Sequence, residues 1–387
     1  MNEQQVLLRL LQVAVCGAQP DKQLKAACTP AMLEAVYKLA VRHDLAHLAG
    51  QGASKLGLPQ SEALQKCTDS AMQAFIRYMQ LEQLYQDVCQ VLEDGRIPFI
   101  PLKGAVLRNA YPESWMRNSC DIDILVKEEI LETAVAQLTQ KLGYTAGKKS
   151  DHDVCLRAPT GAHLELHYDT IQERYEVNGC REVLGRIWED ATPIVPGSCH
   201  MVVSDEMFYF YHMAHMAKHF AVGGCGIRAF LDIWIMQNRM EHDPAQRKAL
   251  LKEGGLEKFA RGMEQVADYW FRDAQPDEMT ELVSRYILRA SLYGDNANRA
   301  ALGQAKMGGK MKYLLLRRVF MPYDHLKAEY PILQKHKWLT PVYQPVRWAR
   351  MIRKGGLKKT TAEWKANSAN DSESTHSAKR LLDHLGL

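Results

Sequence analysis

Cys120-Asp121-Ile122-Asp123-Ile124-Leu125-Val126 places two carboxylates in an otherwise apolar run that is rich in β-branched residues. Side chains alternate between the two faces of a strand, so Asp121 and Asp123 are predicted to share one face. Two like charges held side by side are costly to bury unless a cation neutralises them. Mg²⁺ and Mn²⁺ favour carboxylate oxygens as ligands. The run therefore predicts a strand that carries a divalent metal site.

A third carboxylate follows in a predicted β-hairpin. Residues 153–158 and 163–168 alternate apolar and polar side chains on either side of the turn Pro159-Thr160-Gly161. The same alternation predicts that Glu165 and His167 face away from the core. If this strand neighbours the one with the two aspartates, Glu165 reaches the same cation. Three carboxylates on two adjacent strands are typical of metal-dependent phosphoryl transfer.

The order of these motifs carries a family resemblance. Leu102-Lys103-Gly104, Arg117, the Asp-Ile-Asp pair and Leu164-Glu165-Leu166-His167 follow one another as in the DNA polymerase β-like nucleotidyltransferase superfamily. More closely, the chain resembles the bacterial group called uncharacterised nucleotidyltransferases. The resemblance implies an α+β fold, with a small mixed sheet and helices as the catalytic core and helical regions on both sides of it.

The resemblance also implies roles for individual residues. Asp121, Asp123 and Glu165 correspond to the catalytic carboxylates that bind the metal, and Gly104 lies in the phosphate-binding turn. Many members have Gly-Ser or Gly-Gly where this chain has Lys103-Gly104. Lys103 is thus expected to replace the serine contact with the triphosphate, with Arg117 as a further phosphate contact. A plain strand-to-helix turn with an exposed lysine is the alternative.

A helix predicted from about Ser204 carries three histidines, His212, His215 and His219, at spacings of three and four, which place them on one face. They are candidates for phosphate binding, metal binding or a structural role. The resembling group carries a His-x-x-Lys-His segment here, followed by Gly, Arg and Asp. The matching residues in this chain are His215, Lys218, His219, Gly226, Arg228 and Asp232.

This match implies that the helix supplies positive charge to a nucleotide. Lys218 is expected to hold the β- and γ-phosphates as a point charge. Arg228 is expected to pair with Asp232 one helical turn on, or to contact the nucleotide. An ordinary surface ion pair is the alternative reading of Arg228 and Asp232.

Glycine, proline and polar residues that end the predicted helices and strands divide the chain into four predicted regions. Residues 1–95 form an N-terminal helical region, whose last helix runs from about Ser61 to Asp94. Residues 96–200 form the catalytic core, with a first strand at 97–102 and a helix at 128–142. Residues 201–365 form a C-terminal helical domain that completes the nucleotide cleft, helical from 251 to 316. Residues 366–387 hold a linker, at 367–377, and a short final helix.

Composition limits the classes of function. The chain has 387 residues, 47% of them hydrophobic and 24% charged, as in an ordinary globular protein. Its net charge of +4 is too mild to indicate nucleic-acid binding by itself. Nine cysteines without a Cys-x-x-Cys pair fit reduced thiols in the cytoplasm. The N-terminal segment does not fit a signal peptide, and no window reaches the length of a membrane span, so no membrane partner is expected.

Together these features predict an enzyme that transfers a nucleoside monophosphate from a nucleoside triphosphate, with ATP expected, to a hydroxyl of an acceptor, and that uses two Mg²⁺ or Mn²⁺ ions. A small-molecule acceptor is favoured. A protein or RNA acceptor is the alternative, docked on a basic stretch at 317–359 that is interleaved with aromatic residues. A third possibility is a non-catalytic nucleotide-binding module.

Overall fold

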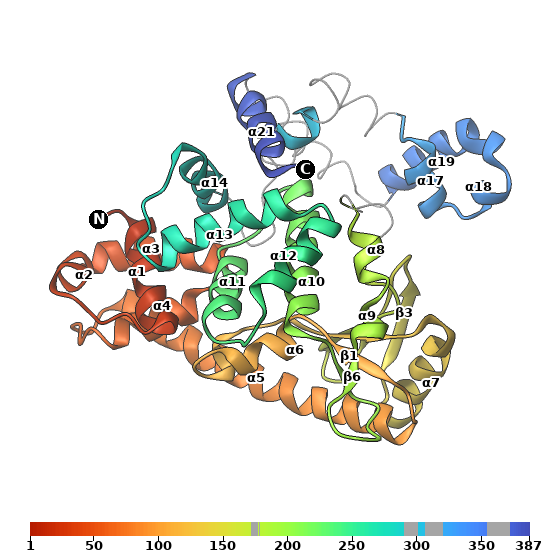
Figure 1. Cartoon of the computed structure of the whole chain (residues 1–387), viewed down its shortest axis with the longest axis horizontal. Coiled ribbons are helices and arrows are strands. Elements are labelled where there is room, and N and C mark those ends of the chain that lie inside the picture. The colour runs from red at the N-terminus through yellow and green to blue at the C-terminus, as the bar shows by residue number, and fades with distance from the viewer. Residues whose placement is uncertain (172–176, 178, 290–300, 306–319, 354–371) are drawn as a thin grey trace.

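The computed structural model describes residues 1–171, 177, 179–289, 301–305, 320–353 and 372–387 (Figure 1). In this structure the chain is α+β, with helices before and after a small mixed sheet. Parts of three predicted segments lie outside the described residues. These are 290–300 and 306–316 of the predicted helical stretch, 367–371 of the predicted linker, and Arg317, Arg318, Lys354, Lys358 and Lys359 of the basic stretch.

The N-terminal region is helical, as predicted. Thr29 and Ser61 cap the helices that follow them, because their hydroxyls accept hydrogen bonds from Met32 N and Leu64 N. Gly95 closes the last helix of the region. The elements are α1 (Glu3–Leu11), a π-helical turn (Gln12–Cys16), α2 (Lys22–Ala27), α3 (Pro30–Arg42), α4 (Ala46–Ser54) and α5 (Glu62–Asp94).

The sheet has five strands in the order β1-β2-β5-β4-β3. They are β1 (Phe99–Pro101), β2 (Asp121–Val126), β3 (Thr145–Lys149), β4 (Asp153–Arg157) and β5 (His163–His167). The predicted hairpin is confirmed, because β4 and β5 are antiparallel neighbours. β2 and β5 pair in parallel, and β1 pairs with β2 in the antiparallel sense. The strand with the aspartates therefore lies directly beside the strand with Glu165.

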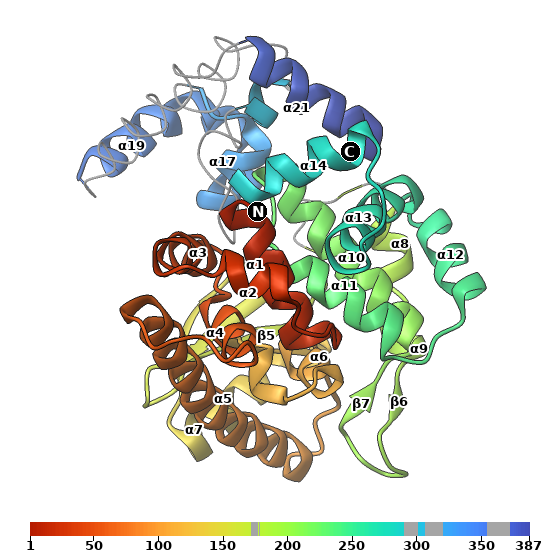
Figure 2. The same cartoon turned by 90° about the vertical axis from the view of Figure 1, so that its left-hand side faces the viewer.

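One face of the sheet is apolar and covered by helices. Ile122 and Ile124 of β2 and Leu164 and Leu166 of β5 are buried in a cluster with residues of α5 and α7. Helix α7 (Leu131–Leu142), preceded by a 3-10 turn (Glu128–Ile130), ends at Gly143 in the left-handed conformation. Helices α5 and α7 lie close to one another in the lower part of Figure 2. Since side chains alternate along a strand, the acidic residues face the other side of the sheet, away from these two helices. The remaining short elements near the sheet are α6 (Gly104–Leu107) and two 3-10 turns (Arg108–Ala110 and Ser114–Met116).

Helices dominate again after the sheet. Ser204 caps α10 (Asp205–Val222), and residues 223–227 join it to α11 (Arg228–Asn238). The other elements are α8 (Cys180–Leu184), α9 (Ile187–Asp190), the strand pair β6 (Thr192–Pro193) and β7 (Met201–Val202), α12 (Pro244–Glu253), α13 (Glu257–Phe271), α14 (Glu278–Arg289), α17 (Tyr323–Glu329), α18 (Ile332–Lys335), a 3-10 turn (Lys337–Leu339), α19 (Thr340–Arg353) and α21 (Ser372–Leu385).

The final helix corrects one prediction. Helix α21 begins at Ser372, so residues 372–377, predicted as linker, are helical. Its buried side chains Leu381 and Leu385 belong to the main core, and this packing stabilises the helix although its first turns are polar. Among the described helices, none has the length and apolarity that crossing a membrane requires.

Candidate active site

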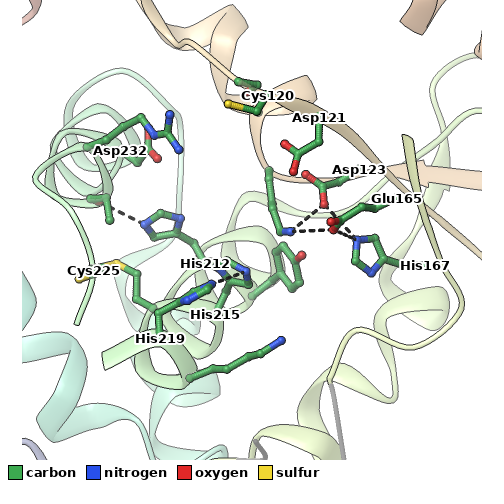
Figure 3. A pocket seen from close by; sticks show the side chains of 18 of the residues that line it. Cys120, Asp121, Asp123, Glu165, His167, His212, His215, His219, Cys225 and Asp232 are labelled. Atoms are coloured by element: carbon green, nitrogen blue, oxygen red, sulfur yellow. Dashed lines mark hydrogen bonds and ion pairs between the residues drawn. The ribbon is translucent and has the colours of Figure 1, made fainter. Parts of the chain in front are cut away.

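Every residue predicted for the site lines one pocket of about 420 Å³ between the sheet and the helices α10 and α11 (Figure 3). The residues come from segments more than 100 positions apart in the sequence, which the fold brings together. They are Lys103, Gly104, Arg117, Asp121, Asp123, Glu165, His215, Lys218, His219, Arg228 and Asp232. We call the side formed by β2, β5 and the turn before α6 the sheet wall, and the side formed by α10 and α11 the helical wall.

On the sheet wall, strand register positions the carboxylates. Asp123 pairs directly with Glu165 across the parallel strands β2 and β5. Asp121 lies two residues earlier on the same face of β2. Figure 3 shows the side chains of Asp121, Asp123 and Glu165 directed into the same space. Burial raises the pKa of the Asp121 carboxyl, and the neighbouring Asp123 charge raises it further. The sheet wall therefore concentrates negative charge in a partly buried place.

The ammonium of Lys103 lies within this carboxylate cluster. Its Nζ is 2.6 Å from Asp123 Oδ1 and 4.0 Å from Glu165 Oε2. Burial alone would lower the pKa of Lys103, but the charge and hydrogen bond of Asp123, together with Tyr211 and Glu165, outweigh burial and raise the pKa. Burial would likewise raise the pKa of Asp123, but Lys103 and His167 hold it well below its usual range. Lys103 is thus charged and balances part of the negative charge.

The turn that carries Lys103 has an unusual backbone. Lys103 has φ +45°, in the left-handed region that side chains with a Cβ rarely adopt. Gly104 follows as the first residue of α6, and a Cβ placed on it would lie 2.2 Å from Ser119 Oγ. Glycine at position 104 therefore lets the turn approach the segment before β2 closely. This close approach keeps the Lys103 side chain beside Asp123.

His167 is the residue of the sheet wall that sequence reasoning left out of the site. Its Nε2 is 3.0 Å from Asp123 Oδ1 and 3.4 Å from Glu165 Oε2. Burial would lower the pKa of His167, but the hydrogen bonds to Asp123 and Glu165 raise it. The spacing Glu165-x-His167 was the available signal, because it predicts that both side chains share one face.

Among the described residues, Asp123, Glu165 and His167 form a group whose ligand atoms all lie within 4.8 Å of one another, close enough for one metal ion. Asp121 is not in this group, although it lines the same pocket. Carboxylate oxygens suit Mg²⁺ and Mn²⁺, and an imidazole nitrogen is a further ligand for Mn²⁺. The sheet wall thus has the donor set for a divalent cation.

On the helical wall, α10 presents His212, His215, Lys218 and His219 to the pocket. His215 Nε2 and His219 Nε2 are 3.2 Å apart, and His212 Nε2 is 3.3 Å from the backbone oxygen of Ala229. Burial lowers the pKa of His215 well below its usual value, and the charge of Lys103 lowers it further. Burial, followed by the charge of Lys103, also lowers the pKa of Lys218. The helical wall is therefore rich in nitrogen donors.

The expected pairing of Arg228 with Asp232 is wrong. Asp232 instead accepts two hydrogen bonds from Arg117, from Nε and Nη2 at 2.8 Å each, and one from Tyr111 Oη at 2.7 Å. Arg228 Nη1 bonds Asp44 Oδ2 at 3.1 Å and the backbone oxygen of Asn118 at 2.9 Å. The one-turn spacing places Arg228 and Asp232 on one helix face, but each meets an oppositely charged partner from a distant segment.

The two walls have complementary chemistry. The carboxylates of the sheet wall can hold a cation, and Lys103, Lys218, Arg228 and the histidines can face an anionic ligand that also contacts this cation. A pocket of about 420 Å³ lies in the size range of small-molecule sites. A nucleotide polyphosphate bound through a divalent cation has both of the required charges.

Comparison with known proteins agrees with this geometry. The model of a family described as "Uncharacterised nucleotidyltransferase" matches residues 29–272, more than half of the chain. The match includes the sheet, α10, α11 and every pocket residue predicted from the sequence. No curated protein and no solved structure matches the chain significantly. The chain belongs to the uncharacterised nucleotidyltransferase family.

Proposed function

We propose that this protein transfers a nucleoside monophosphate from a nucleoside triphosphate, with ATP as the expected donor, to a hydroxyl group of an acceptor. The acceptor oxygen forms a bond to the α-phosphorus, the bond from that phosphorus to the oxygen bridging to the β-phosphorus breaks, and pyrophosphate leaves. One observation carries the proposal: Asp123 and Glu165 are paired in register and face nitrogen-rich helices across a single pocket.

The sheet wall fits a divalent metal, Mg²⁺ or Mn²⁺. Asp121, Asp123 and Glu165 would hold it with their oxygens, and His167 would hold or orient it with Nε2. When bound, such a metal lowers the pKa of the acceptor hydroxyl and neutralises the charge that develops on the leaving oxygen. The position of Lys103 supports the fit, because a positive charge already lies 2.6 Å from Asp123 Oδ1.

The protein's own groups position the substrates and move the proton. Glu165 keeps a third of its side chain exposed, whereas Asp123 is buried, so Glu165 is the better-placed acceptor for the hydroxyl proton. Lys218, His215, His219 and Lys103 stabilise the phosphates electrostatically. Arg228 bonds Asp44 at the pocket edge and can add a further contact.

Arg117 and Asp232 take a different role in this proposal. Both line the pocket, but they are buried and bind each other through two hydrogen bonds. They are positioning residues, because they tie α11 to the segment before β2 and so set the distance between the two walls. Gly104 likewise acts through the close approach of its turn to Ser119.

A small molecule is the favoured acceptor. In the described part of the basic stretch, several cations lie over aromatic rings of the same segment: Lys327 and Lys337 over Tyr323, and Arg350 over Tyr330. These rings are already engaged, which leaves fewer of them to stack on RNA bases.

A protein or RNA acceptor is the second candidate, because Trp338 of this stretch is 74% exposed. The third, a non-catalytic module, is disfavoured, because Lys103 balances only part of the charge of the three clustered carboxylates, and a purely structural role would not require such a cluster. Nine free thiols are consistent with the cytoplasm as the proposed location.

The test is nucleotide turnover with each radiolabelled nucleoside triphosphate, Mg²⁺ or Mn²⁺ and a cell lysate. We expect release of pyrophosphate and label on a small metabolite; label on protein or RNA would instead support the second candidate. The double variant Asp121→Asn/Asp123→Asn should reduce turnover about 1,000-fold or more, because the metal loses its carboxylates. Asp87→Asn, on α5 and outside the pocket, is the matched control. Unchanged turnover in the double variant would refute the proposal.

A further inference from the structure

A second group of metal-ligating side chains lines the same pocket beside the carboxylate cluster. It consists of His152, Asp153 and His167, whose ligand atoms all lie within 4.8 Å of one another. Strand pairing builds the group: Asp153, the first residue of β4, pairs directly with His167, the last residue of β5. His152 immediately precedes β4, and its backbone oxygen accepts a hydrogen bond from Tyr168 N at 2.9 Å. The backbone therefore fixes the positions of all three residues.

Hydrogen bonds orient His152 and Asp153 from outside the group. The Ser150 hydroxyl donates its only proton to Asp153 Oδ1. It therefore accepts from His152 Nδ1, at 2.9 Å, and Asp151 Oδ1 is a second acceptor for that nitrogen at 3.1 Å. Nδ1 of His152 is thus the protonated nitrogen, and its Nε2 keeps the lone pair. A histidine whose outer nitrogen donates to a carboxylate is the usual arrangement of a metal ligand.

The inward atoms have a spacing that suits a cation. His152 Nε2 and Asp153 Oδ2 are 3.7 Å apart, too far for a hydrogen bond. Zinc bonds to nitrogen and oxygen are about 2.0–2.2 Å long, so one ion can contact both atoms. His167 directs Nε2 toward Asp123 and Glu165. A neutral imidazole has one lone pair, so while Nε2–H donates to these carboxylates, Nδ1 is the nitrogen that can bind an ion in the second group.

We propose that His152, Asp153 and His167 form a second cation site that takes a borderline transition metal such as Zn²⁺ rather than Mg²⁺. Two imidazoles and one carboxylate are a donor set that divalent transition metals prefer, whereas Mg²⁺ prefers oxygen ligands. Three protein ligands leave a tetrahedral ion one open position. Because all three residues line the pocket, that position is accessible to a ligand bound there. The site does not depend on the proposed transfer reaction.

Lys218 is the competing positive charge at this site. It lies on α10 across from the group, and the charges of Asp151 and Asp153 attract its ammonium. A divalent cation at the second site would repel Lys218 and weaken this attraction. Lys218→Met should therefore strengthen cation binding about threefold to tenfold. Variants that remove a metal-binding side chain should instead weaken it, so the two kinds of variant test the proposal in opposite directions.

The experiment is a titration of the metal-free, full-length protein with Co²⁺, followed by visible absorption in the presence of excess Mg²⁺. Co²⁺ serves as a coloured substitute for Zn²⁺, and the near-ultraviolet region separates nitrogen and oxygen ligands from the thiolates of the cysteines. We expect one Co²⁺ per chain that Zn²⁺ displaces and Mg²⁺ does not. His152→Gln and Asp153→Asn should each weaken its binding at least tenfold.

Two controls keep the result specific. His163→Gln removes another histidine of β5, one that contacts Cys155 Sγ at 3.5 Å and lies outside the group, and it should bind Co²⁺ like the wild type. Asp121→Asn should lose nucleotide turnover but keep Co²⁺ binding, so a failure of the proposed reaction and a failure of this site are distinguishable. Thermal unfolding verifies that each variant is folded. Unchanged Co²⁺ affinity in folded His152→Gln, or complete displacement by Mg²⁺, would overturn the proposal.

Discussion

The two walls of the pocket are held together in different ways. On the sheet wall, backbone pairing of β2 with β5 places Asp123 beside Glu165, and the side chains follow from the strand period. On the helical wall, side-chain bonds join distant segments: Asp232 bonds Arg117, 115 residues away, and Arg228 bonds Asp44, 184 residues away. The contrast teaches that strand pairing leaves the Glu165 side chain one-third exposed in the pocket, whereas Asp232 on the helical wall is buried against Arg117.

Asp232→Asn should have the largest effect on stability. Arg117 and Asp232 are both buried, so the variant leaves a buried guanidinium without its counter-charge. We expect a loss of about 3–5 kcal/mol in the free energy of unfolding, measured by urea denaturation. Glu257→Gln, which removes an exposed ion pair with Arg261 on α13, is the control and should cost at most about 0.5 kcal/mol. Equal midpoints for the two variants would remove the contrast between the walls.

Glu165→Gln should have the opposite profile. The side chain is one-third exposed and its strand neighbours remain, so we expect little change in the unfolding midpoint. Turnover should fall about 100-fold or more, because the variant loses a metal ligand and the proton acceptor. Pyrophosphate release at saturating nucleotide measures the effect, with the exposed Glu128→Gln as the control. A folded variant with full turnover would show that Glu165 takes no part in the chemistry.

Lys103→Met sharpens the comparison, because Lys103 belongs to the sheet wall but has the charge of the helical wall. Its ammonium competes with any cation for Asp123 and Glu165. In nucleotide-free protein, Mn²⁺ should bind about tenfold more tightly to the variant, as measured by the paramagnetic resonance signal of free Mn²⁺. Lys149→Met removes an exposed lysine that pairs with Glu128, and it should leave Mn²⁺ affinity unchanged. Weaker Mn²⁺ binding to Lys103→Met would contradict the competition.

The smallest effect concerns two histidines with opposite pKa shifts. His167, beside Asp123, has a raised pKa, and buried His215 on α10 has a lowered one, relative to 6.5. In cation-free protein, NMR titration should show His167 protonating above pH 6.5 and His215 well below it. His167→Gln and His215→Gln assign the signals. Titration of both histidines at the same pH would contradict the difference between the walls.

The sign of each contribution to stability follows from linkage. The stabilising contribution of His167 is full below pH 6.5 and is lost as pH rises through its folded-state pKa. The contribution of His215 is present above pH 6.5 and is lost as pH falls toward its folded-state pKa, because only the unfolded chain accepts the proton there. Unfolding curves of the two Gln variants across this range test both signs.

Local periodicity made much of the fold predictable from sequence. The alternation in 153–167 predicted the hairpin of β4 and β5, and the stop at Gly95 predicted the end of α5. Strand β3 was missed, because Thr145-Ala146-Gly147-Lys148-Lys149 is exposed along its whole length and shows no apolar alternation. The parallel pairing of β2 with β5 is a long-range choice, and no single segment encodes it.

The candidate site divides in the same way. Two-residue spacing predicted that Asp121 and Asp123 share one face, and the order of the motifs predicted that Glu165 joins them. All three residues line the pocket. Spacing could not reveal that Asp232 bonds Arg117 instead of Arg228, since that choice depends on which distant segment reaches it. Spacing placed His167 on the face of Glu165, but its contact with Asp123 depends on the register of β5 against β2.

The bonds made by the N-terminal helices have a consequence for dissecting this protein. Asp44 holds both Arg228 and Asn118, and His47 Nε2 lies 2.9 Å from the backbone oxygen of Met116. The N-terminal helices therefore fix the segment before β2 and the start of α11 relative to each other. A recombinant fragment limited to residues 96–200 would lack these contacts and the helices α10 and α11. Biochemical work on the pocket therefore calls for expression of the whole chain.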